Sequence, residues 1–543
     1  MVTKKRQSDS LKVDLDSKRA KSGNESITDD YSGFKITQAG LELPVVDLND
    51  ITKETFQREY IMRRKPCLIS GIIPGLQAER FGIEQLESTL EFENNLQVEK
   101  KINGGFGSGV NREKMSLSSL IERILNGDDS LYLTTQYTED DAEKHGNVDP
   151  PSDYDEDEDE EDKMESIPKF ASIENASQSS LDFNDLRDDY DDLESDEDFE
   201  EEDFEDDLNE SYIDNKLQLT SEEANQRIAE LFQGPLKNMY KKSDILPVQP
   251  EILDILVPQQ INIWVGSSPK SSVDIEKGID ESQSDLGIGR SVPGNCTSSG
   301  LHHDHADNIY VPIMGHKRFT LFSPNNVTKL YTVGKVNKLY NSGVINYTRT
   351  PEFPSWANIR EDGAMISEVA KQRLELSDIA GGAKLDEDEK KELLKIIADE
   401  EEALNKIEVA HIGEIKKDPP SFSRIPPALL HLDEIKNDEI RQKLESYLEK
   451  YYPEFAKIKE LKITVDVKPG QMLYLPAGWF HEVTSYGTSD RCEGHSRAHI
   501  ALNYWYNPPG RMDPSDPYTD DYWKSDFERT LASIEHYQKE EVN

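Results

Sequence analysis

One short stretch of the chain concentrates side chains that bind metals, His302-His303-Asp304-His305, with Asp307 two positions later. In an extended segment, residues two apart share a face, so His302 and Asp304 can point to one side while His303 points to the other. His305 and Asp307 repeat this spacing and form a second, competing pair. An imidazole and a carboxylate on one face supply two of the three ligands of a facial non-haem iron(II) site.

The candidate for the third ligand is His481, at the end of the sequence Pro476-Ala-Gly-Trp-Phe-His481. Three protein ligands on one face leave the opposite coordination positions open for a co-substrate and oxygen. Two alternatives stand beside this hypothesis. A His-X-Asp pair also arises by chance, and His481 could be a histidine packed in an aromatic cluster with Trp479 and Phe480.

Short apolar strands bounded by proline and glycine turns surround these residues and would position them. Strands are predicted at 67–71, 131–135, 261–265, 309–313, 318–322, 462–467, 472–476 and 499–506. Many short strands of this kind are typical of a sandwich or a jelly-roll barrel. The sequence therefore predicts a β framework in which segments far apart in the chain can share one interior.

Helices are predicted where capping residues precede apolar positions at helical spacing. Thr52 and Ser116 are the expected N-caps of two of them, and Asp386 with Glu389 forms a capping box for a third. Apart from this third helix, the stretch 324–462 is expected to be irregular. The last helix carries an apolar stripe that could seal the barrel or pair with a second copy of the chain, formed by Trp523, Phe527, Leu531, Ile534 and Tyr537.

Residues 299–324 and 467–506 resemble the JmjC-domain family of Fe(II)- and 2-oxoglutarate-dependent oxygenases, which have a cupin-type jelly roll. The motifs that carry the resemblance are Gly300-Leu-His-X-Asp304, Gly315-His-Lys-Arg-Phe319, Pro469-Gly-Gln-Met-Leu-Tyr-Leu-Pro-Ala-Gly-Trp-Phe-His481 and Ala501-Leu-Asn-Tyr-Trp505. The resemblance implies Fe(2+) as the metal and 2-oxoglutarate and O2 as co-substrates.

Site residues follow from the resemblance position by position. It implies that His302, Asp304 and His481 hold the iron and that Lys317 pairs with the distal carboxylate of 2-oxoglutarate. The other residues that it assigns to the co-substrate pocket are Tyr132, Ser299, Asn308 and Asn503. Lys317 lies in an apolar strand, where a buried ammonium is costly unless an anion pairs with it. Its surroundings therefore also favour a role in binding an anion.

The predicted fold class is mainly β with flanking helices (α+β). It is a double-stranded β-helix interrupted by an acidic and a partly helical insertion. The predicted segments are a basic disordered tail (1–33), the first part of the catalytic domain (34–138), an acidic disordered insertion (139–214), the first half of the core (215–323), a partly helical insertion (324–461), the second half of the core (462–509) and a C-terminal helix (510–543).

The charge of the chain is strongly acidic and unevenly distributed. The 543 residues include 62 basic and 108 acidic ones, for a net charge of −46. Residues 139–214 alone hold 35 acidic and four basic side chains, which predicts disorder. This segment could be a solvated loop or could attract a basic protein partner, whereas nucleic acid would be repelled. The three cysteines, Cys67, Cys296 and Cys492, are too few for a four-cysteine zinc site.

Two basic clusters near the start of the chain, Lys4-Lys5-Arg6 and Lys18-Arg19-Ala-Lys21, are typical of a bipartite nuclear-import signal. Nuclear residence, with some protein in the cytoplasm, is therefore expected. No apolar run approaches the length of about 18 residues that a membrane span needs, so no membrane partner is expected.

The predicted function is an Fe(II)/2-oxoglutarate-dependent dioxygenase that hydroxylates a protein side chain. The sequences of the motifs are most similar to those of the small JmjC lysyl hydroxylases, so lysine is the first candidate for the hydroxylated residue. Three alternatives remain: a JmjC histone lysine demethylase acting in chromatin, a non-catalytic JmjC scaffold, and a tRNA-base hydroxylase. The acidic charge disfavours the last of these, and the complete set of ligands with Lys317 disfavours a scaffold.

Overall fold

The computed structural model describes most of the chain outside its N-terminal and acidic segments. The described residues are 27–101, 105–106, 112–136, 221–268, 275, 278–280, 282–283, 286–294, 296–354, 356–378, 384–405, 418–486 and 498–542. The predicted import signal (4–21) and acidic insertion (139–214) lie outside these residues.

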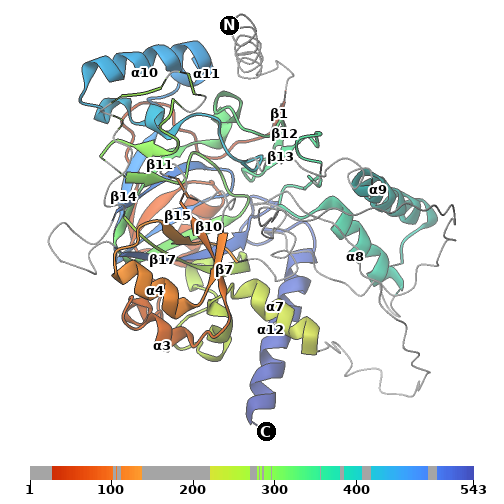
Figure 1. The fold of residues 1–543 in the computed structure, drawn as a ribbon. Helices are drawn as coiled ribbons and strands as arrows, with labels where there is room; N and C mark the ends of the chain where they lie inside the picture. Colours follow the sequence, from red (N-terminus) through yellow and green to blue (C-terminus); the bar gives the residue numbers. More distant parts are fainter. Residues whose placement is uncertain are drawn as a thin grey trace, which may run out of the picture.

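Two large sheets and one small sheet form the β framework (Figure 1). The larger sheet has the order β2 (Val45–Asp47), β3 (Cys67–Ser70), β15 (Gln471–Leu475), β10 (Asp307–Met314), β17 (Ala498–Asn507), β7 (Val257–Ser267), β6 (Leu131–Leu133), β4 (Leu96–Lys100) and β5 (Arg112–Met115). The second sheet has the order β14 (Ile463–Val467), β11 (His316–Phe322), β16 (Phe480–Tyr486), β9 (Cys296–Ser298) and β8 (Ser291–Val292). The small sheet consists of β1 (Thr28–Asp29), β12 (Val336–Leu339) and β13 (Ile345–Tyr347).

The two large sheets pack against each other through the alternate side chains of their strands. In β10, Tyr310 belongs to a buried cluster that also contains Phe319 of β11 and Val483 of β16. Its neighbours Ile309 and Val311 belong to a different cluster, on the outer face of the larger sheet. Successive side chains of β10 thus point to opposite faces of the sheet, and both faces are buried. The fold is the predicted cupin-type jelly roll with insertions.

Helices cover the outer face of the larger sheet. They are α2 (Lys53–Phe56), α3 (Leu86–Leu90), α4 (Leu117–Leu125) and α7 (Ser221–Leu231). The predicted caps are confirmed, because the Thr52 side chain accepts a hydrogen bond from the backbone N–H of Thr55 and the Ser116 side chain accepts one from Ser119. These helices bury the side of β7, β10 and β17 that faces away from the second sheet.

The insertion at 324–461 is more helical than the sequence predicted. It contains α8 (Ile366–Asp378), α9 (Glu387–Asn405), α10 (Asp438–Tyr451) and α11 (Pro453–Ala456). The expectation of a single helix was wrong, because α10 presents an apolar face, Ile440, Leu444, Tyr447 and Leu448, that packs in a buried cluster shared with Phe480 of β16. The predicted capping box of α9 is confirmed, with Asp386 and Glu389 exchanging side-chain to backbone hydrogen bonds of 2.8 and 3.0 Å.

The two ends of the described chain differ from the predicted boundaries. Thr28 and Asp29, placed in the disordered tail, form β1 and pair with β12 in parallel. The C-terminal helix, α12 (Tyr522–Val542), begins later than residue 510 and packs on α7 and β7. Its Tyr537 hydroxyl donates to the Ser221 carbonyl at 2.7 Å. Within the described part of the chain, no helix combines the length and the apolar character needed to cross a bilayer.

Candidate metal centre

The three predicted metal ligands converge between the two large sheets. One ligand atom from each of His302, Asp304 and His481 can be chosen so that all three lie within 4.8 Å of one another. His481 Nε2 lies 3.6 Å from the nearer Asp304 carboxylate oxygen, and the two imidazole centroids are 4.3 Å apart. The sequence predicted that these three residues share one site, although the 324–461 insertion separates His481 from the other two.

The backbone brings the distant histidine to the pair. His302 and His481 form an antiparallel bridge in which each backbone N–H donates to the other's carbonyl, at 3.0 and 2.7 Å. The backbone N–H of Gly478 also donates to the Asp304 carbonyl at 2.8 Å. In the extended segment considered at 302–304, the only regular pairing that the structure describes is this bridge, and β10 begins at Asp307.

Hydrogen bonds orient both imidazole rings toward the ligand position. Nδ1 of His302 lies 3.0 Å from the Gly300 carbonyl oxygen, and Nδ1 of His481 lies 3.0 Å from that of Trp479. Nδ1 must therefore carry the proton in each ring, which leaves Nε2 free to bind a metal. Burial, together with the nearby His481, lowers the pKa of His302 well below its usual value. The neutral form that a metal ligand requires is thus favoured.

The competing pair, His305 and Asp307, has a structural role instead. Both Asp307 oxygens accept hydrogen bonds from Arg64, one of them at 2.8 Å. Asp307 also accepts from the Tyr474 hydroxyl at 2.7 Å and from the Ala477 backbone N–H at 3.0 Å. His305 Nε2 lies 2.9 Å from the Ile345 carbonyl oxygen. The Arg64–Asp307 ion pair is fully buried and ties the start of β10 to the turn that precedes His481.

Replacing Asp307 with asparagine should destabilise the protein by about 3–5 kcal/mol, because Arg64 would keep a buried charge without its partner. Urea denaturation followed by fluorescence measures this loss. The matched control is Asp516→Asn, which removes a half-exposed carboxylate from Arg511 and should cost at most about 1 kcal/mol. Equal losses in the two variants would contradict a structural role for the buried pair.

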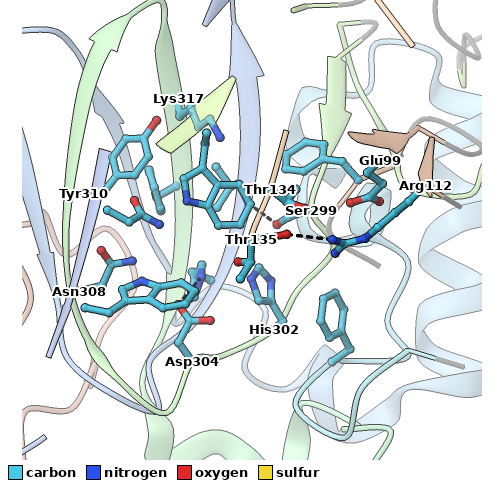
Figure 2. Close-up of a pocket in the computed structure, with 18 residues that line it drawn as sticks. Glu99, Arg112, Thr134, Thr135, Ser299, His302, Asp304, Asn308, Tyr310 and Lys317 are labelled. Carbon is cyan, nitrogen blue, oxygen red and sulfur yellow. Dashed lines mark hydrogen bonds and ion pairs between the residues drawn. The ribbon is translucent and has the colours of Figure 1, made fainter. Parts of the chain in front are cut away.

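A cavity connects the three ligands to the other predicted residues (Figure 2). Ser299, Asn308, Lys317 and Asn503 line it. Tyr132 lies directly behind the wall, where its hydroxyl accepts a hydrogen bond from the Lys317 ammonium. The structure therefore brings all eight predicted site residues to this cavity or to its immediate wall.

Lys317 provides a buried cation at one end of the cavity. It is 3% exposed, and its Nζ lies 5.4 to 5.9 Å from the ring centroids of Phe106, Trp264 and Tyr310. Burial, and to a lesser degree the nearby Lys101, lowers the pKa of Lys317 to about 7. Among the described residues, no carboxylate forms an ion pair with Lys317. A bound anion would favour the charged form.

The three predicted polar residues differ in how they are held. Ser299 Oγ accepts from the Val483 backbone N–H at 3.1 Å and lies 2.9 Å from the Gly300 carbonyl oxygen. In the amide orientation that satisfies both groups, the Asn503 side-chain oxygen accepts from Trp264 Nε1 at 3.0 Å. Asn308 Oδ1 is buried without a hydrogen-bond partner in the part of the chain that is described, so it can accept a hydrogen bond from a ligand.

Sequence reasoning missed several residues of the cavity wall. Glu99, Arg112, Thr134 and Thr135 come from β4, β5 and the end of β6, and Phe422 comes from the insertion. The Phe422 ring stacks on His302 at 4.8 Å between centroids, with the two planes 12° apart. No local motif marks these residues. The pairing of β4 with β5 and β6 brings the first four of them to the site.

The donor set fits ferrous iron and a dicarboxylate. Two neutral imidazole nitrogens and one carboxylate form the ligand set of non-haem iron oxygenases, with room left for other ligands. The ammonium of Lys317 lies on the same cavity. It offers the positive charge that pairs with a carboxylate.

Comparison with known proteins agrees with this geometry. Residues 53–512 match the cupin-like domain family. The chain is also 25% identical over 541 aligned positions to JmjC domain-containing protein 4 of Schizosaccharomyces pombe, with 90% of each protein covered. The match includes all three candidate metal ligands and most of both large sheets. The chain therefore belongs to the cupin-like domain family.

Proposed function

We propose that this protein is an Fe(II)- and 2-oxoglutarate-dependent dioxygenase that hydroxylates a protein side chain, with lysine as the first candidate. The observation that carries the proposal is the convergence of His302, Asp304 and His481 on one cavity that also contains the buried ammonium of Lys317. The net charge of −46 supports a substrate protein with a basic segment.

Each residue has a defined task in this reaction. His302, Asp304 and His481 would hold the iron, with both rings fixed by backbone carbonyls. Lys317 would bind the far carboxylate of 2-oxoglutarate, and the Tyr132 hydroxyl would hold the ammonium in place. When bound, iron and 2-oxoglutarate supply the oxidising chemistry that inserts oxygen into a C–H bond. The aromatic wall around Lys317 excludes water and strengthens its pairing with the anion.

The test is turnover of 2-oxoglutarate to succinate by the full chain with Fe(II) and ascorbate, with lysine-rich and methyl-lysine peptides present. We expect succinate formation that stops when a chelator removes the metal. Mass spectrometry should show peptides heavier by about 16 Da, the mass of one inserted oxygen. Loss of about 14 Da from methyl-lysine would instead identify a demethylase. Absence of both 2-oxoglutarate binding and turnover would overturn the proposal in favour of a scaffold.

A further inference from the structure

Arg290 lies directly before β8 and joins three segments that are far apart in the sequence. Its Nη1 donates to the carbonyls of Phe106 and Ser299, each at 2.7 Å, and its Nη2 donates to the Asp418 carboxylate at 2.5 Å. Its guanidinium carbon also lies over the Phe422 ring, 4.9 Å from the centroid. The side chain is only 16% exposed. Arg290 therefore connects the segment that carries two of the candidate ligands to the 324–461 insertion.

The His302 ring is held by two restraints, and Arg290 contacts both of them. Nδ1 of His302 lies 3.0 Å from the Gly300 carbonyl oxygen, and the ring stacks on Phe422, with the centroids 4.8 Å and the planes 12° apart. Arg290 binds the carbonyl of Ser299, directly before Gly300, and packs on the same Phe422 ring. A hydrogen bond to the second nitrogen fixes the orientation of a ligand histidine, and a stacked ring limits its rotation further.

Glycine leaves room for the Arg290 side chain at two close approaches of the backbone. A Cβ atom at Gly105 would overlap Cδ of Arg290, and one at Gly300 would lie 3.3 Å from its Nε. Gly300 also has a backbone φ of +79°, which glycine adopts without a steric penalty. The arginine is thus packed into a defined place in the structure, and its position does not depend on exposed contacts alone.

The part of the insertion that carries Phe422 is anchored beside the candidate ligands. The backbone N–H of Ser423 donates to the Leu301 carbonyl at 2.8 Å, and the backbone N–H of Val333 donates to the Phe422 carbonyl at 2.7 Å. Phe422 is 5% exposed and lines the cavity. The insertion therefore contributes a wall of the site and a contact to the ring of a ligand.

We propose that Arg290 is a positioning residue of the metal centre. By holding the Ser299–Gly300 backbone and the Phe422 ring at once, it fixes His302 in the orientation that places a ligand nitrogen beside Asp304 and His481. The planar guanidinium is suited to this task, because its donors reach several acceptors in fixed directions, whereas an ammonium is a compact point charge. The inference rests on the proposed function, since it takes the three convergent residues to be metal ligands.

The test is a titration of the full chain with Co(II) alone, without 2-oxoglutarate. The visible absorption of bound Co(II) reports both the affinity and the geometry of the ligands. The variants are Arg290→Gln, Arg290→Lys, Phe422→Leu and the double variant Arg290→Gln/Phe422→Leu. Arg424→Gln is the matched control, because Arg424 lies in the same segment of the insertion and donates to the Val333 carbonyl at 2.7 Å. Urea denaturation of each variant ensures that affinities are compared between folded proteins.

We expect the wild type and Arg424→Gln to bind Co(II) with the same affinity and the same spectrum. Arg290→Gln should bind Co(II) roughly tenfold more weakly or worse, as loss of an outer partner of a metal ligand implies, and its spectrum should change. Arg290→Lys should resemble Arg290→Gln, because the charge alone does not reproduce the contacts. The double variant should lose less than the two single losses combined, because both residues act on the same ring.

Unchanged affinity and spectrum in Arg290→Gln would overturn the inference, and so would full recovery in Arg290→Lys or strictly additive losses in the double variant. If Arg290→Gln does not fold, Asp418→Asn takes its place, since it weakens the link to the insertion and keeps the arginine. This variant should bind Co(II) several-fold more weakly than the wild type, and an unchanged affinity would again overturn the inference. Failure of the wild type to bind Co(II) would instead overturn the metal centre and the proposed function.

Discussion

Replacing His302 with alanine should lower both iron binding and 2-oxoglutarate turnover by more than about a hundredfold. Loss of a residue that merely orients a metal ligand already lowers metal affinity or activity roughly 10- to 100-fold. This substitution removes the ligand itself. The fold should survive, because the bridge between His302 and His481 is made by backbone atoms that alanine retains. Iron content after equilibrium dialysis and succinate formation are the two measurements.

The matched control for this loss is His316→Ala. His316 begins β11 next to Lys317, so the alternation of the strand turns its side chain away from the cavity. This variant should retain the metal and the turnover of the wild type. If His302→Ala bound iron as tightly as His316→Ala did, His302 would not be a ligand, and the oxygenase proposal would fail at its first step.

The β framework was predictable because its signals are local. Gly315, with a backbone φ of +70°, turns the chain between β10 and β11, where glycine has no steric penalty. The apolar runs at 309–313 and 318–322 fall inside these two strands. Strand pairing was not predictable in the same way. The contact between β10 and β17 joins segments almost 200 residues apart, and no local pattern specifies it.

The insertion shows where the same local reasoning fell short. Asn437 caps α10 by accepting from the backbone N–H groups of Glu439 and Ile440, and the apolar positions that follow have helical spacing. These apolar positions lie in a stretch rich in charged residues, which weakens the local signal for a helix. Asp307 could not be separated from Asp304 by spacing, because only Arg64, far away in sequence, decides which carboxylate is neutralised in the core.

The burial of Lys317 was predictable from its neighbours in the chain, whereas the burial of Glu99 was not. Lys317 lies in an apolar strand, so its burial follows from its neighbours. Glu99 lies in a short strand, Leu96–Lys100, that alternates apolar and polar residues like many surface strands. Its burial depends on β6 covering one edge of β4 while β5 covers the other. Tertiary pairing alone turns this glutamate from a surface residue into a cavity residue.

Replacing Lys317 with methionine should stabilise the metal-free protein while removing its affinity for 2-oxoglutarate. Methionine keeps the packing volume against Phe106, Trp264 and Tyr310 and avoids the cost of a buried ammonium. We expect a gain of roughly 1–4 kcal/mol in the free energy of unfolding at pH 7. We also expect 2-oxoglutarate to bind more than about tenfold more weakly, because a charge-assisted pair is lost. Lys468→Met, in an exposed turn, is the control and should change neither quantity.

The pH dependence of the two effects separates this explanation from a simple packing change. The pKa of Lys317 is lowered to about 7 from an ordinary value of 10.5, so between these values the unfolded chain binds more protons than the folded one. The stability of the wild type should therefore rise with pH through this window, and the advantage of Lys317→Met, fully present below pH 7, should vanish toward pH 10.5. Binding of 2-oxoglutarate by the wild type should weaken above about pH 7, by up to about tenfold per pH unit, because the site must take up a proton to pair with the carboxylate. The stability difference between the two proteins could instead stay constant from pH 6 to 10. That result would show that Lys317 has the same protonation state in the folded and unfolded chains. It would remove the basis for assigning Lys317 to the distal carboxylate of 2-oxoglutarate.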